Sequence, residues 1–398
     1  MPVVRVSSRC AIRFVLLPTN HDHVAKGFRR YTARVAITRN CLVWVLTDIL
    51  SDSHRFCPMK LLIVATVAFT SILACSATAG ADYAVKQKFV IGGEGGWDYL
   101  TYDAMADRLF VSRGTHVQVI DPARGAVLAD IPDTLGVHGI ALADDLGKGF
   151  ISNGRDNSIT VFELKTLRIL TKIKTEAGEN PDFIAYDSVS KRVFAFNGRS
   201  HNASVIDATD LKVLATIPLD GKPESAVTDG TGALFVNIED RDEITKLDAG
   251  KAAAVATWPI PGCHQPAALA IDREKRRLFS GCQNKRLVVV DANSGRDVAT
   301  LPIGAGVDAA AFDPNTKLAF SSQDDGTLTI VKEVVPGAYG VVQTVITQLG
   351  ARTLALNPKN HDLYLVTAEF EMPAADQARP RRTVKASTFT LLVVSSRN

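Results

Sequence analysis

Short apolar runs recur from residue 83 to the end of the chain, and turns rich in Asp, Gly, Asn and Lys separate them. The runs carry many β-branched and aromatic residues, as in RLFVS at residues 108–112 and RLVVVD at residues 286–291. Runs of this kind between turn residues are typical of β-strands. After residue 82 no stretch of useful length shows the apolar period of an amphipathic helix. The pattern predicts an all-β protein.

These runs belong to a unit that occurs seven times. Each unit reads as a strand of small residues, a polar turn, an apolar strand, a polar loop and two further strands. The polar residue that closes the first strand marks the repeat, and its spacings are 41, 43, 42, 43, 41 and 44 residues. This period matches a four-stranded propeller blade. The marker residues are Asp103, Asp144, Asp187, Asp229, Asp272, Asp313 and Asn357.

The last unit lacks its fourth strand. The stretch YAVKQKFVI at residues 83–91 has the pattern of a fourth strand and aligns with YGVVQTVI at residues 339–346. An open ring would expose unpaired strand edges, and pairing the N-terminal strand with the last unit removes them. We therefore predict a single domain over residues 82–398, a seven-bladed β-propeller closed by the N-terminal strand joining the last blade.

The region before the propeller has the pattern of an export signal. Residues 59–81 contain Lys60, an apolar segment over residues 61–73, and small residues in A-x-A spacing at Ala77 and Ala79. This order is that of a secretory signal peptide. Residues 1–58 then read as an upstream over-extension that does not fold. We expect a periplasmic or secreted protein; the alternatives are an internal membrane anchor or a lipoprotein attached through Cys75, which ends a partial lipobox.

Charge excludes one broad class of function. Without residues 1–81 the chain has 35 Lys and Arg against 39 Asp and Glu, so the domain is mildly acidic. A mildly acidic surface is not suited to general nucleic-acid binding. We expect a small molecule or a protein as partner, a monomeric state, and membrane contact only through a lipid at Cys75.

Two of the six cysteines lie in the propeller. Cys263 precedes the first strand of the fifth unit and Cys282 ends the second strand of the same unit, so both belong to one rim of the ring. Export to an oxidising compartment favours a disulfide between them. A free thiol pair or a metal site is the alternative.

Polar side chains gather at the same rim. The first strand of a blade begins where the second ends, because the two are antiparallel. Convergent polar groups in a concavity are the usual form of a ligand or partner site, although such residues also cap strands and turns. We call this side of the ring, where the first strands begin, the first-strand rim; its candidate binding residues are Asp98, Arg113, His138, Arg155, Asp182, Arg199, Glu224, His264, Asp308 and Arg352.

Motifs for metals, cofactors and catalysis are weak. The rim carboxylates suit Ca²⁺, which takes oxygen ligands, and His138 or His264 suits a transition metal, but no zinc-type spacing is present. No haem-attachment C-x-x-C-H, G-x-S-x-G, Walker loop or dinucleotide fingerprint occurs. We expect no cofactor apart from a possible Ca²⁺ at the rim, leave the metal open and assign no catalytic residue.

The repeats resemble those of YncE-like proteins in the bacterial YVTN-repeat β-propeller superfamily. The resemblance covers residues 83–398 and is carried by landmarks such as GGEGGWDYL at residues 92–100, RVFAFNGRS at 192–200 and GARTLALNP at 350–358. It implies the propeller fold. It does not imply one function, because a fold hosts many.

Two functions follow from this reading. The first is an exported, non-enzymatic propeller that binds a small ligand or protein at the first-strand rim. The alternative is an enzyme of the lactonase or hydrolase type that uses a metal at that rim, with His138 or His264 as base.

Overall fold

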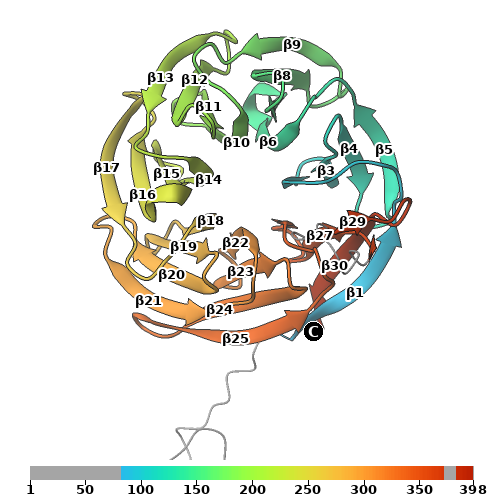
Figure 1. The fold of residues 1–398 in the computed structure, drawn as a ribbon, viewed down its shortest axis with the longest axis vertical. Coiled ribbons are helices and arrows are strands. Elements are labelled where there is room, and N and C mark those ends of the chain that lie inside the picture. Colours follow the sequence, from blue (N-terminus) through green and yellow to red (C-terminus); the bar gives the residue numbers. More distant parts are fainter. Residues whose placement is uncertain (1–81, 372–381, 398) are drawn as a thin grey trace, which may run out of the picture. The chain divides into compact units, whose positions relative to one another are not determined.

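The computed structural model describes residues 82–371 and 382–397, and within them the predicted seven-bladed β-propeller is confirmed (Figure 1). The predicted signal segment, Cys75 and residues 1–58 lie outside the described residues. In the part of the chain that is described, no helix has the length and apolar character needed to cross a bilayer.

Each blade is a four-stranded antiparallel sheet, and in the first six blades the strands run in chain order from the centre of the ring outward (Figure 1). The first three are β2 (Leu100–Asp103), β3 (Arg108–Ser112), β4 (Val117–Asp121) and β5 (Ala126–Ile131); β6 (Val137–Ala143), β7 (Lys148–Asn153), β8 (Ser158–Glu163) and β9 (Ile169–Lys174); and β10 (Pro181–Asp187), β11 (Arg192–Asn197), β12 (Asn202–Asp207) and β13 (Val213–Pro218). 

Blades four to six repeat this order. They are β14 (Pro223–Thr228), β15 (Ala233–Ile238), β16 (Glu243–Asp248) and β17 (Ala253–Pro259); β18 (Pro266–Asp272), β19 (Arg277–Cys282), β20 (Arg286–Asp291) and β21 (Asp297–Pro302); and β22 (Val307–Asp313), β23 (Leu318–Gln323), β24 (Thr327–Val335) and β25 (Ala338–Ile346).

The seventh sheet combines strands from both ends of the described chain. From the centre outward it contains β26 (Leu354–Leu356), β27 (Leu363–Thr367), β30 (Thr390–Ser396) and β1 (Tyr83–Val90), and β1 pairs antiparallel with β30. A short hairpin of β28 (Phe370–Glu371) and β29 (Thr383–Val384) stands between β27 and β30 in the chain.

The core lies between neighbouring sheets. Side chains of a strand alternate between its two faces, so the second strand of each blade packs on the blade before and the blade after. In β11, Phe194 and Phe196 join one apolar cluster with blade four, whereas Val193 and Ala195 join another with blade two. This two-sided burial explains why the second strands read as unbroken apolar runs.

The marker residue of the repeat stabilises the turn between the first and second strands. Asp103 accepts hydrogen bonds from the backbone N–H groups of Met105 and Ala106, and Asp272 accepts them from Glu274 and Lys275. These carboxylates are buried, as are their counterparts in most other blades. A buried carboxylate needs such donors. This need accounts for the regular spacing of the marker residues along the chain.

Blade two departs from this pattern. Asp144 is exposed and begins a single 3₁₀ turn, η1 (Asp144–Leu146), which ends at Gly147 in the left-handed conformation. The same turn between β6 and β7 is therefore made by a different backbone conformation.

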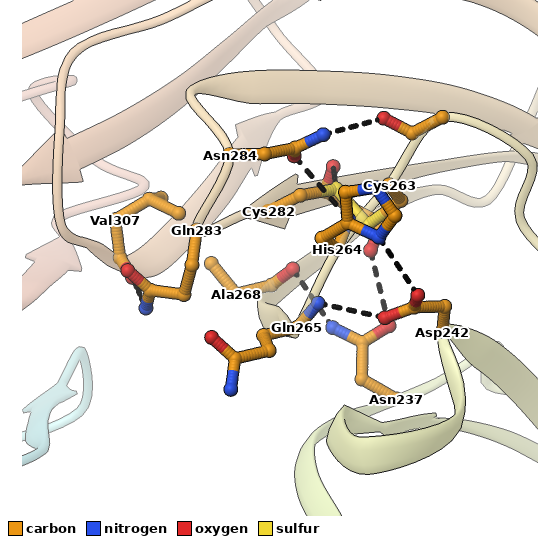
Figure 2. Close-up of a disulfide and its surroundings, with 12 residues drawn as sticks. Asn237, Asp242, Cys263, His264, Gln265, Ala268, Cys282, Gln283, Asn284 and Val307 are labelled. Atoms are coloured by element: carbon orange, nitrogen blue, oxygen red, sulfur yellow. Dashed lines mark hydrogen bonds and ion pairs between the residues drawn. A yellow bond between two sulfur atoms is a disulfide. The ribbon is translucent and has the colours of Figure 1, made fainter.

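The predicted disulfide between Cys263 and Cys282 is confirmed (Figure 2). Pro266 is the cross-strand partner of Cys282, so Cys263 lies three residues before it, in a loop that folds back over the strand end. Both cysteines are buried. Asn284 donates to the carbonyl of Gly262 at 2.8 Å and fixes the same loop.

We expect the double variant C263A/C282A to lose roughly 3 kcal/mol of unfolding free energy, because a disulfide with this short sequence separation restricts the unfolded chain by that amount. Urea unfolding of the oxidised full-length protein measures the loss. Wild-type protein unfolded in dithiothreitol is the control and should match the variant. Equal stability of the oxidised protein and the variant would contradict the prediction.

Candidate functional site

One position at the start of each innermost strand, or two residues before that strand in blades one and seven, lies at the mouth of the central channel. In blades two to six this position lies within a β-bulge, where the register between the first and second strands shifts by one residue. Bulges re-aim side chains and are common beside functional sites. Around the ring the corresponding residues are Asp98, His138, Asp182, Glu224, Ala267, Asp308 and Arg352.

His138 lies between two of these carboxylates. Its Nδ1 donates to Asp98 Oδ2 at 2.6 Å and lies 3.5 Å from Asp182 Oδ1. The three side chains are 28%, 23% and 14% exposed, so water screens them little. Burial lowers the pKa of His138, but the bond to Asp98 and the charge of Asp182 outweigh it and raise that pKa to about 9.

The other charges of the ring form two further pairs. Lys222 Nζ lies 3.1 Å from Glu224 Oε2 and also binds Glu239. Arg352 Nε lies 3.0 Å from Asp308 Oδ2. Burial nevertheless raises the pKa of both Glu224 and Asp308, because the neighbouring carboxylates add to the cost of ionisation and one cation each does not offset it.

A cavity of about 220 Å³ lies among the innermost strands and reaches the ring at Asp308. Tyr99 and Phe183 line it and meet edge to face with their ring centres 5.1 Å apart. Burial, followed by the charges of Glu224 and Asp182, raises the pKa of Tyr99 well above its ordinary value. The phenol therefore stays neutral.

Sequence reasoning missed Tyr99 and Lys222. Tyr99 follows Asp98, at a position where Gly139 and Ser225 stand in other blades, so its aromatic ring was the available signal. Lys222 precedes the first strand of blade four and stands two residues before Glu224 in the chain. An ion pair between the two could have been anticipated from this spacing.

Several predicted rim residues lie outside the charged ring. His264 is 70% exposed and pairs with Asp242 at 2.9 Å, beside the disulfide (Figure 2). The register places Ala267, not His264, at the ring position of blade five, because His264 precedes the strand. Arg155 and Arg199 are exposed on loops of the same rim, and no contact joins them to the ring within the described residues. Arg113, which directly follows β3, is buried and is not one of the charged ring residues.

The expected four-carboxylate Ca²⁺ site is not assembled. Among the described residues, one group of three metal-binding side chains comes together, Asp98, His138 and Asp182, with ligand atoms within 4.8 Å of one another. Glu224 and Asp308 are engaged by Lys222 and Arg352 instead. The group therefore offers a mixed nitrogen and oxygen donor set, and not the oxygen set that Ca²⁺ prefers.

We expect the unfolding free energy to fall by about 2 kcal/mol as the pH rises from 6.5 to 9, because the folded protein holds the proton of His138 more tightly than the unfolded chain does. The contribution is complete below pH 6.5 and lost as the pH passes 9. Urea unfolding of H138Q at pH 6.5 and 9 should show a smaller decrease. H264Q, which removes an exposed histidine of the same rim instead, is the matched control. An unchanged decrease in H138Q would refute the assignment.

Comparison with solved structures supports the fold. The chain is similar to Kuenenia stuttgartiensis hydrazine synthase, with a TM-score of 0.60 and 15% identity over 68% of this chain and 92% of that chain. At this identity the likeness concerns the fold alone. No curated protein matches. These comparisons support a seven-bladed propeller but not the narrower resemblance to YncE-like proteins.

A family comparison adds what the motifs did not show. The model of the family described as "Cytochrome D1 heme domain" matches residues 108–319, from β3 in blade one to β23 in blade six. The expectation that the chain uses no cofactor is contradicted by this match, because the family is described as a heme domain. The match spans more than half of the sequence, and the chain belongs to the cytochrome D1 heme domain family.

Proposed function

We propose that this protein is a ligand-binding propeller that holds a heme-type tetrapyrrole at the first-strand rim, where His138 would bind its iron. The observation that carries the proposal is the position of His138 inside the ring, with Nδ1 held by Asp98 at 2.6 Å. Histidines that bind metals commonly donate their second ring nitrogen to a carboxylate, which fixes the ring and leaves the other nitrogen for the metal. The family match supports the choice of ligand.

The side chains at the ring are of the chemical types that bind such a group. His138 supplies an imidazole, and Lys222 and Arg352 are cations suited to the acidic side chains of a tetrapyrrole. Tyr99 and Phe183 supply aromatic surface just below. The imidazole binds iron in its neutral form, so binding releases its proton. A heme iron with a histidine ligand supports electron transfer or the binding of small molecules.

Space decides where the ligand lies. The cavity of about 220 Å³ is smaller than ordinary ligand pockets, which measure about 300–1,000 Å³. Nε2 of His138 also faces Gly154, where an added Cβ would lie 2.9 Å from that nitrogen. We therefore place the ligand at the mouth of the channel and not within it, with a local shift of the His138 ring or of the Gly154 loop.

The remaining expectations belong to the same proposal. An exported protein in the periplasm or outside the cell, acting as a monomer on a small ligand or protein partner, agrees with the predicted signal segment. The resemblance to YncE-like repeats remains a prediction. Nothing in the comparisons favours the metal-dependent hydrolase.

Titration of the full-length protein with hemin tests the proposal. We expect a shifted and saturable Soret band in the wild type, and a weakening of affinity by more than about tenfold in H138Q, which corresponds to roughly 1.4 kcal/mol. H264Q is the matched control, because His264 also pairs with a carboxylate but is exposed on the same rim. We expect H264Q to behave as the wild type.

Two outcomes would overturn the proposal. One is a wild-type spectrum that hemin does not change in a saturable way. The other is equal affinity in H138Q and H264Q while both variants keep the wild-type melting temperature.

A further inference from the structure

Among the described residues, Arg113 is a buried cation with no carboxylate within ion-pair distance. Arg113 directly follows strand β3 in the chain, and it is 1% exposed. Nη2 donates to the carbonyl oxygen of Glu94 at 2.8 Å, whereas Nε and Nη1 find no acceptor among the residues that the structure describes. A buried guanidinium is normally paired, because leaving its N–H groups unbonded is costly.

Stacking accounts for only part of this environment. The guanidinium carbon lies 3.5 Å from the ring centre of Phe389, a favourable contact between a cation and an aromatic face. Such stacking uses the flat face of the guanidinium. Its N–H groups point outward in the plane, so Nε and Nη1 still lack partners.

A third donor lies in the same cluster. Trp97 Nε1 is buried and has no acceptor among the described residues. The Trp97 ring packs on Phe389 with its centre 5.5 Å away, so Trp97 and Arg113 contact the same aromatic ring. Three nitrogen donors that have no acceptor among the described residues are suited to an anionic oxygen ligand.

A short glycine-rich loop covers this cluster. Residues 92–96 read GGEGG, and Gly92, Gly93 and Gly95 have positive φ angles of 73°, 81° and 93°, which glycine adopts without strain. Residues 93–96 are exposed. The bond from the Arg113 guanidinium to the Glu94 carbonyl is therefore made by an exposed loop. An anion from solvent can replace that carbonyl as the acceptor.

We propose that Arg113 and Trp97 form a carboxylate-binding subsite beneath the loop of residues 92–96. A carboxylate can take two parallel N–H bonds from a guanidinium. It would supply a negative charge in direct contact, whereas Asp130 acts on Arg113 without forming an ion pair with it. Asp98, which binds His138, directly follows Trp97, so the subsite adjoins the charged ring. The identity of the molecule that bears the carboxylate rests on the proposed function, but the subsite can be tested without it.

Acetate is the probe, and the indole N–H signal of Trp97 is the readout, in full-length protein labelled with ¹⁵N-tryptophan. We expect this signal, assigned with W97F, to move in a saturable way when acetate replaces chloride at constant ionic strength. The signal of Trp258, in the outer strand of blade four, should stay fixed. R113Q should abolish the movement, whereas R199Q, an equal change of charge on an exposed loop, should retain it.

Each arm decides the inference separately from heme binding. A Trp97 signal that is the same in acetate and chloride, or that moves equally in R113Q and wild type, would overturn it. Saturation by phosphate at a lower concentration than acetate would also overturn the carboxylate assignment. Melting curves establish that R113Q is folded.

Discussion

The buried acidic side chain at the turn between the first two strands is the constraint on which the ring depends. In Asp103, Asp272 and Asp313 this carboxylate is almost inaccessible and accepts backbone N–H bonds from the turn that follows. Because the turn is fixed, the register between first and second strands is fixed as well. The bulge that directs Asp182, Glu224 and Asp308 into the channel mouth therefore recurs at the same strand position in these blades. In blade two, where Asp144 is exposed, the 3₁₀ turn η1 accompanies the same register shift at His138.

The same geometry creates an electrostatic cost at the mouth. Four carboxylates are brought into a poorly solvated space, and His138, Lys222 and Arg352 offset them in pairs. The raised pKa values of Asp182, Glu224 and Asp308 show that this compensation is incomplete. Clusters of ionisable groups whose pKa values are shifted by burial and by neighbouring charges are frequently functional sites. This is the physical reason for placing the ligand here.

Much of the fold could be predicted from the sequence, because each blade repeats the same pattern of turn residue and apolar strand. The spacing of the seven marker residues from Asp103 to Asn357 was enough to count the blades, and the positions of Cys263 and Cys282 favoured a disulfide between them. The strand register that decides which residue of each blade reaches the ring was harder to predict. The loop of blade five holds His264 before a proline, and a shift of a few residues moves the histidine out of the ring and Ala267 into it.

Side-chain environments and the cofactor were beyond sequence patterns. The isolation of Arg113 depends on three segments that meet only in the folded chain, the loop of residues 92–96, the end of β3 and Phe389. The expectation of no cofactor relied on the absence of a C-x-x-C-H motif, which detects covalent attachment alone. A non-covalent ligand held by one imidazole leaves no such local signature.

Ala267 has a consequence for the symmetry of the molecule. Seven nearly equivalent blades around an axis would present a bound disc with seven indistinguishable rotational settings. The ring residues differ from blade to blade and remove that degeneracy, and Ala267 adds the one ring position without a polar group. The charge around the opening is therefore unequal, so a ligand there would meet a different set of side chains in each rotational setting.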